Sequence, residues 1–202
     1  MESRGDTGPP VVLVHGSPGD LRDWEAVGRL LSRSCRVVTY DRRGHGPIER
    51  LLPRGTTAEE VADLAAVIES QGITPAHVVG MSSGAIVVLH LIIERPDLFS
   101  SAAIHEPPLY GLVEDEGLPE PVREDRPSEI DVNALASFGG PLLMTEGDQS
   151  PRLFRDVLDQ IGDVMPRAQR HVFRGSGHAP HLTHPDDFAL VVGSFINGVH
   201  VL

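Results

Sequence analysis

Short apolar runs alternate with longer amphipathic stretches along most of the chain. Pro10–Val14 (PVVLV) is the clearest short run, and Arg36–Tyr40 (RVVTY) has the same character. Continuous apolar runs of this length are typical of strands that are buried on both faces of a parallel sheet. The other expected strands are His77–Val79, Ser101–His105, Pro141–Thr145 and Gln169–Phe173. The pattern therefore predicts an α/β fold with about six strands in a doubly wound, mainly parallel sheet.

The amphipathic stretches between these runs predict the helices that cover the sheet. One helix should begin near Ala58, because Thr57 can serve as its N-cap and Glu60 completes a capping box. The other helices are expected at Trp24–Ser32, Ala85–Glu94, Arg152–Gln160 and Pro185–Asn197. Since strands and helices alternate throughout, residues 1–202 are expected to form a single domain.

One segment, Gly111–Ser128, departs from this alternation. Acidic residues and prolines dominate it, and apolar positions are few. Such a composition is typical of a solvated loop or an abbreviated insertion.

Composition and charge exclude several classes of function. The 202 residues carry a formal net charge of −12, which repels nucleic acid and anionic membranes. No apolar run approaches the ~20 residues of a membrane span, and Met1–Pro10 lacks the apolar core of a signal peptide. With one cysteine, Cys35, neither an internal disulfide nor a zinc-ligand pattern is available. We therefore expect a cytoplasmic protein that binds neither nucleic acid nor membranes and needs no metal.

The basic residues narrow the chemistry further. All 17 of them are arginines. Without lysine the chain cannot form a Schiff base, anchor pyridoxal phosphate or build a P-loop. We expect no cofactor.

The segment Gly80–Gly84 (GMSSG) follows an expected strand and precedes an expected helix. A G-x-S-x-G pattern in this setting is typical of a nucleophile elbow. The sharp turn holds the serine oxygen clear of the sheet, and the helix directs its positive N-terminus at it. The pattern predicts Ser82 as a nucleophile.

Two further segments supply partners for such a serine. Val12–Gly19 (VLVHGSPG) ends a strand in a sharp loop, so the N–H of Ser17 could form an oxyanion hole with that of Ser83. The histidine of this loop, His15, is expected to be structural. Gly175–Pro180 (GSGHAP) lies between the last strand and the last helix and presents His178 as a general base. His181 and His184 are competing candidates for that role, but the preceding glycine pair favours His178.

These three motifs, together with Tyr40–Gly46 (YDRRGHG), resemble the α/β-hydrolase superfamily in their order and over nearly the whole chain. The resemblance implies a serine nucleophile, a histidine base and acyl-transfer chemistry. It also implies that Asp41–Gly46 is mainly a structural turn. Two departures are expected: the family's first two antiparallel strands should be missing, and its cap should be reduced to Gly111–Ser128 as a vestigial cap or loop.

Two carboxylates compete to support the histidine. The family's common acid lies three residues beyond the glycine that ends the seventh strand, and Ser150 occupies that place after Gly147. Asp148 lies only one residue past this glycine. Some members, such as haloalkane dehalogenases, place the acid directly after the sixth strand, where this chain has Glu106. We favour Glu106 and keep Asp148 as the alternative.

The resulting hypothesis is a carboxylesterase-like serine hydrolase of a small-molecule ester, lactone or thioester. One alternative keeps the same residues for a lyase, C–C hydrolase or cyclase of a small-molecule biosynthetic pathway. Another is a non-catalytic small-molecule binder. A homo-oligomer also stays open, since a second subunit could cover an exposed apolar mouth of the site.

Overall fold

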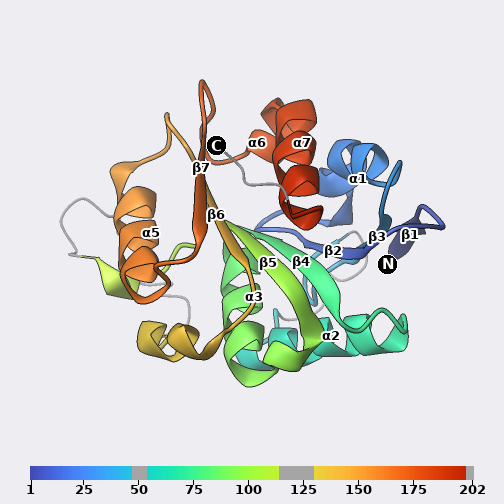
Figure 1. The fold of residues 1–202 in the computed structure, drawn as a ribbon, viewed down its shortest axis with the longest axis horizontal. Helices are drawn as coiled ribbons and strands as arrows, with labels where there is room; N and C mark the ends of the chain where they lie inside the picture. The colour runs from blue at the N-terminus through green and yellow to red at the C-terminus, as the bar shows by residue number, and fades with distance from the viewer. Residues whose placement is uncertain (47–53, 114–129, 199–202) are drawn as a thin grey trace.

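The computed structural model describes residues 1–46, 54–113 and 130–198. Within these ranges, one seven-stranded sheet has the order β1-β3-β2-β4-β5-β6-β7 (Figure 1). Its six parallel strands are β2 (Pro10–Val14), β3 (Arg36–Thr39), β4 (Ala76–Met81), β5 (Phe99–His105), β6 (Leu142–Gly147) and β7 (Gln169–Phe173). Every strand that the apolar runs predict is present, so the mainly parallel α/β sheet is confirmed.

The seventh strand, β1 (Glu2–Arg4), was not expected from the sequence. It pairs antiparallel with β3, with Glu2 opposite Thr39 and Arg4 opposite Val37. The expectation that both of the family's N-terminal antiparallel strands are missing is therefore wrong for one of them. Pairing at the sheet edge uses backbone groups, and Arg4 also donates to Glu25 at 2.8 Å. A polar strand held in this way leaves no apolar pattern in the sequence.

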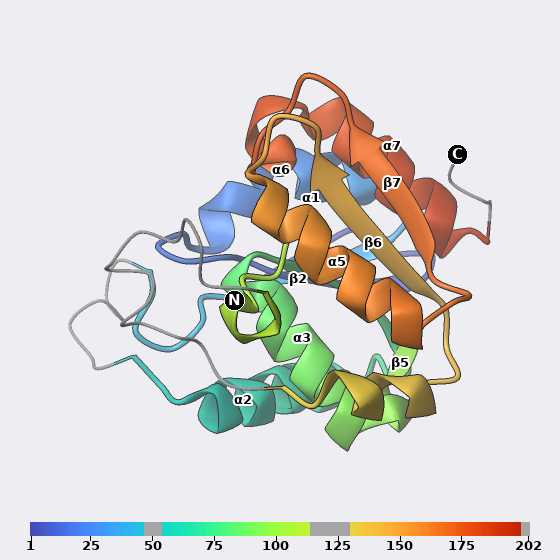
Figure 2. The ribbon, with the colours of Figure 1, turned by 90° about the vertical axis from the view of Figure 1, so that its left-hand side faces the viewer.

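Helices cover both faces of the sheet. The α-helices are α1 (Glu25–Leu31), α2 (Thr57–Ser70), α3 (Ser83–Glu94), α5 (Arg152–Val164), α6 (Pro180–Thr183) and α7 (Pro185–Ile196). Short 3₁₀ segments are η1 (Leu21–Trp24), η3 (Pro96–Leu98), η4 (Tyr110–Leu112) and η5 (Val132–Ser137). The helices α1 and α7 lie side by side and share one apolar core with the sheet (Figure 1). The helices α2, α3 and α5 share the other core, and Figure 2 shows α3 and α5 in front of the strands.

The capping box of α2 is shifted by one residue from the prediction. Thr56 is the N-cap, and it exchanges hydrogen bonds with Glu59. Two overlapping patterns fit the sequence here, Thr56 with Glu59 and Thr57 with Glu60. The second is not used, because the carboxylate of Glu60 is buried and pairs with a guanidinium group.

Most of the predicted vestigial cap or loop, residues 114–128, lies outside the described residues. Of its beginning, Gly111 and Leu112 belong to η4. In the described part of the chain, none of the helices combines the length and apolar character that crossing a membrane requires.

The register of the central strands brings their carboxyl ends to one edge of the sheet. Met81 of β4 pairs with His105 of β5, which pairs with Thr145 of β6. The residues that immediately follow β4 and β5, Ser82 and Glu106, are therefore neighbours at this edge.

Candidate active site

Ser82 occupies the sharp turn between β4 and α3. Its φ of 51° and ψ of −124° lie in a region that residues other than glycine rarely adopt. The flanking glycines permit close packing. A Cβ on Gly80 would lie 2.7 Å from the Cα of Ala85, and a Cβ on Gly84 would lie 2.4 Å from the backbone oxygen of the residue after β2. This is the strand–turn–helix setting expected for a nucleophile elbow.

His178 lies between the serine and a carboxylate. Its Nε2 is 2.9 Å from Oγ of Ser82, and its Nδ1 is 2.6 Å from Oε2 of Glu106. Since the carboxylate can only accept, Nδ1 carries the proton and Nε2 is free to accept one from the serine hydroxyl. The structure thus brings together three residues that are far apart in the sequence.

Glu106 is fully buried at the end of β5. Its Oε1 accepts a hydrogen bond from the N–H of Gly147 at 2.7 Å, and its Oε2 accepts one from Oγ of Ser150 at 2.9 Å. Burial raises the pKa of Glu106, but the nearby His105 ring and the hydrogen bonds from His178 and from the Gly147 N–H outweigh burial. The pKa therefore lies well below its usual range, and the carboxylate is ionised at neutral pH.

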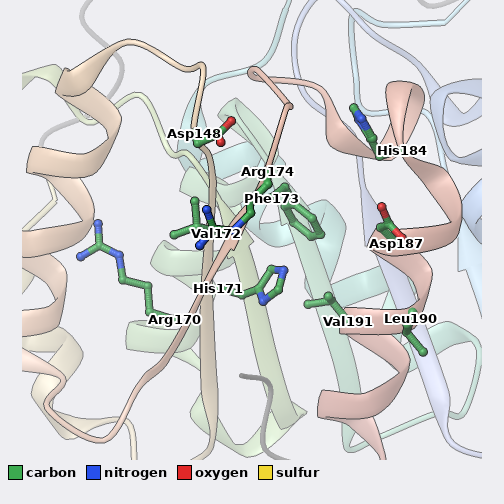
Figure 3. Close-up of a pocket in the computed structure, with 10 residues that line it drawn as sticks. All are labelled: Asp148, Arg170, His171, Val172, Phe173, Arg174, His184, Asp187, Leu190 and Val191. Atoms are coloured by element: carbon green, nitrogen blue, oxygen red, sulfur yellow. The ribbon is translucent and has the colours of Figure 1, made fainter.

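Asp148, the alternative acid, has a different position and partner. It is exposed, and its Oδ1 accepts a hydrogen bond from the N–H of Gly175 at 2.8 Å. It also lines a groove of about 630 Å³ between β7 and α7 (Figure 3). Ser82, Glu106 and His178 are not among the residues that line this groove. The carboxylate of Asp148 therefore shapes the loop before His178, while Glu106 contacts the His178 ring itself.

The competing histidines point elsewhere. The ring of His181 is buried and lies 4.8 Å from the ring of Trp24, and burial lowers the pKa of His181 to about 3. The Nδ1 of His184 lies 2.8 Å from the hydroxyl of Thr183. Among these three histidines, His178 is the one that contacts Ser82.

The loop after β2 packs directly against the serine. A Cβ on Gly16 would lie 3.0 Å from the Cβ of Ser82. His15 holds this loop: its Nε2 accepts the backbone N–H of Arg42, so its Nδ1 donates to the oxygen of Gly16 at 2.7 Å. That bond fixes the peptide unit that joins Gly16 to Ser17. An oxyanion hole formed by the Ser17 and Ser83 amides stays a prediction.

A buried ion pair joins this loop to the elbow. Arg42 pairs with Glu60 at 2.6 Å, and its guanidinium also donates to Oγ of Ser83 at 2.8 Å and to the oxygen of His15 at 3.0 Å. Burial of His15 lowers its pKa to about 4, so the ring is neutral beside this cation. The sequence predicts Arg42 as part of a structural turn, but its link to Ser83 was not expected.

Three further residues that contact Glu106 or His178 were also not predicted from the sequence. Ser150 donates to Glu106, and the ring of Phe154 stacks on that of His178 at 4.6 Å. The buried His105 places its Nε2 at 3.6 Å from Oε2 of Glu106. The only available signal was the position of Ser150, where the resembled family has its common acid.

His105, Glu106 and His178 could also be considered as metal ligands. Among the described residues, they are the group of three whose ligand atoms lie within 4.8 Å of one another. Both nitrogens of His178 already face a partner, Ser82 or Glu106. A metal ion at this place would displace the bond to the carboxylate, so the arrangement suits proton transfer better than metal binding.

Comparison with known proteins identifies relatives of this chain. A model of the alpha/beta hydrolase family matches residues 11–129. The Mycobacterium tuberculosis protein named "putative non-heme bromoperoxidase BpoC" is 42% identical over 100 residues, which make up 48% of this chain and 38% of that protein. The matched region thus spans well under half the length of that relative.

Solved structures extend the likeness over the whole fold. The crystal structure of BpoC has a TM-score of 0.79 at 23% identity and covers 99% of this chain and 96% of that chain. A thermophilic esterase from Thermogutta terrifontis has a TM-score of 0.77 at 18% identity and covers 99% and 93% of the two chains. At these identities the likeness concerns the fold.

Proposed function

The chain belongs to the alpha/beta hydrolase family, and from this premise we propose that it is a serine hydrolase of small-molecule esters, lactones or thioesters. The observation that carries the proposal is the position of His178. Its Nε2 lies 2.9 Å from the Ser82 hydroxyl and its Nδ1 lies 2.6 Å from the Glu106 carboxylate. The ring can take a proton from the serine on one side while the carboxylate stabilises the charged ring on the other.

The proposed reaction has two halves. Oγ of Ser82 attacks the substrate carbonyl while Nε2 of His178 takes its proton, and the N–H groups of Ser17 and Ser83 stabilise the oxyanion. His178 then gives the proton to the leaving oxygen or sulfur, and an acyl ester remains on Ser82. Water attacks this ester with His178 again as the base, which releases the acid and restores the serine. None of these steps uses a metal or a cofactor.

Two considerations support an acyl substrate. A serine nucleophile suits carbonyl chemistry, whereas family members that open alkyl halides or epoxides use an aspartate. The Thermogutta terrifontis relative is named an esterase. Esters, lactones and thioesters share the carbonyl carbon and a leaving group that His178 can protonate.

A fluorophosphonate probe tests the proposal, because it labels a serine only where a base activates it. We expect one labelled peptide, containing Ser82, and no labelling of that peptide in Ser82→Ala. Hydrolysis of a short p-nitrophenyl ester should fall at least about 10³-fold in the same variant. Ser83→Ala is the matched control: it keeps its backbone amide, so its loss should be much smaller.

Other outcomes favour the alternatives. An unlabelled Ser82 in a folded protein would contradict the proposal and favour a small-molecule binder. Labelling of Ser82 without turnover of any ester, lactone or thioester would favour a lyase, a C–C hydrolase or a cyclase that uses the same residues. A larger loss in Ser83→Ala than in Ser82→Ala would mean that the nucleophile is assigned to the wrong serine.

A further inference from the structure

The segment from the end of β6 to the first turn of α5 contacts the proposed acid and base without donating or accepting a proton in the reaction. Ser150 donates to Oε2 of Glu106. Four residues later, the ring of Phe154 lies 4.6 Å from the His178 ring with an angle of 15° between the two planes. Phe154 is 7% exposed, so its place in the fold is fixed by packing.

A stacked phenyl ring interacts differently with the neutral and the protonated form of an imidazole. The face of an aromatic ring carries partial negative charge and attracts cations. Phe154 should therefore stabilise the imidazolium form of His178 more than the neutral form. In the proposed reaction, this charge appears on His178 when Ser82 loses its proton.

Other groups around the His178 ring would stay in place if Phe154 were replaced. The carboxylate of Glu106 lies 2.6 Å from Nδ1, and the ring of His105 lies 6.1 Å away at a tilt. His181, on α6, is buried with its pKa lowered. The side chain of His178 is 38% exposed, so water reaches part of the ring. Phe154 can thus stabilise the protonated His178 ring in addition to Glu106 and solvent.

We propose that Phe154 is a positioning residue for His178, whose ring holds the imidazole between Ser82 and Glu106 and favours its charged form. The consequence for turnover rests on the proposed function. The preference for the charged ring is a property of the folded protein, and it can be measured without a substrate.

The direct test is a proton titration of His178 by NMR in protein labelled at histidine. The His178 signal is identified by its loss in His178→Gln. Phe154→Leu keeps an apolar side chain and removes the aromatic face, so the charged ring loses stabilisation and should release its proton at lower pH. We expect a midpoint lower by about half a pH unit or more, within the range of cation–π interactions. Phe154→Tyr keeps the aromatic face and should keep the midpoint.

An unchanged or higher midpoint in Phe154→Leu would overturn the proposal. Phe154 would then only fill space, and the smaller leucine would admit water that solvates the cation. If Phe154→Leu does not fold, Phe154→Met supplies a second apolar replacement with the same expected result. The matched control is Phe195→Leu on α7, where Phe195 is 5% exposed. It should lower the melting temperature as Phe154→Leu does and leave the midpoint unchanged.

Kinetics provide the second readout. Phe154→Leu should lower kcat about three- to tenfold with little change in KM, because the lost contact is strongest when His178 is charged. Phe154→Tyr should restore most of the rate. A loss confined to KM would overturn the positioning role. If the parent protein neither turns over esters nor reacts with the fluorophosphonate, the proposed function fails, whereas the titration still decides the role of Phe154.

Discussion

Two carboxylates that follow neighbouring parallel strands differ in nearly every physical respect. Glu106, after β5, is fully buried, and its oxygens meet Gly147, Ser150 and His178. Asp148, after β6, is exposed, and its Oδ1 accepts the N–H of a loop residue. The two residues lie at the same edge of the sheet, yet only the first contacts a ring nitrogen of the histidine.

The difference shows that a place at the end of a strand is not enough to make a carboxylate the partner of a histidine. Glu106 is held by donors on both oxygens, and low exposure strengthens each of these bonds. It also has a positive φ of 43°, a conformation that persists only where surrounding contacts enforce it. Asp148 contacts His178 only indirectly, because its partner Gly175 belongs to the loop that carries this histidine. Glu106 places a negative charge against the His178 ring, whereas Asp148 holds the loop that carries this ring.

The largest expected effect comes from Glu106→Gln. The amide cannot stabilise an imidazolium, and its NH₂ group can hold His178 in the wrong tautomer. We expect kcat on a p-nitrophenyl ester to fall by up to about 10⁴-fold, with the fold retained by circular dichroism. Near-normal turnover in this variant would remove Glu106 from the proposed mechanism.

The contribution of Glu106 to the free energy of unfolding should depend on pH. Because its pKa is lower in the folded protein than in the unfolded chain, the unfolded chain takes up the proton first as the pH falls. The contribution of the carboxylate to stability is therefore complete above the unfolded value, about 4.3, and is lost at lower pH. Urea unfolding of the parent and of Glu106→Gln should show their difference shrinking between about pH 6 and pH 3, by at least about 1.4 kcal/mol. A difference that does not vary with pH would contradict the lowered pKa.

Most of the fold could be predicted because apolar runs mark strands that are buried on both faces. The six parallel strands were found in this way. The short strand β1 could not be found, because its residues Glu2, Ser3 and Arg4 are held by backbone pairing and an ion pair. The N-cap of α2, Thr56, was placed one residue too late because two capping patterns overlap in the sequence. The buried Arg42 decides which of them is used, because it pairs with Glu60.

The residues of the candidate site also fall into those that local sequence predicts and those that it does not. Ser82 and His178 could be predicted from glycines that adjoin them in the sequence, and the structure places them in contact. Ser150 and Phe154 could not be predicted, because their roles arise from contacts with residues that are distant in the sequence. Phe154 in particular is one apolar position of an amphipathic helix, and nothing local distinguishes it from a core residue.

A smaller effect is expected from Ser150→Ala. It removes one donor to Oε2 of Glu106 and leaves the N–H of Gly147 on the other oxygen. A hydrogen bond to a charged group contributes about 1.5–3 kcal/mol, and we expect a loss of about tenfold in kcat, at the lower end of that range. Ser150→Thr keeps the hydroxyl and should keep most of the rate. Equal rates in the alanine variant and the parent would show that Glu106 is held without this serine.

The smallest effect is expected from Asp148→Asn, and it tests the comparison most directly. The amide oxygen of asparagine can still accept the N–H of Gly175, so the loop keeps its hydrogen bond. We expect the free energy of unfolding to change by no more than about 0.5 kcal/mol and kcat to stay within about twofold. Asp148→Ala removes the acceptor and should cost about 1 kcal/mol and a few-fold in rate, because the position of His178 depends on this loop.

The opposite result would mean that Asp148, and not Glu106, supports His178 during the reaction. If Asp148→Asn were inactive while Glu106→Gln kept its rate, the exposed carboxylate would have to move from Gly175 to the histidine during the reaction. The double variant Glu106→Gln/Asp148→Asn shows whether Asp148 can take over the role of Glu106. If Asp148 supports His178 only when Glu106 is lost, the double variant should be slower than Glu106→Gln alone. If Asp148 only shapes the loop, adding Asp148→Asn should leave the rate of Glu106→Gln unchanged, because asparagine preserves the bond to Gly175.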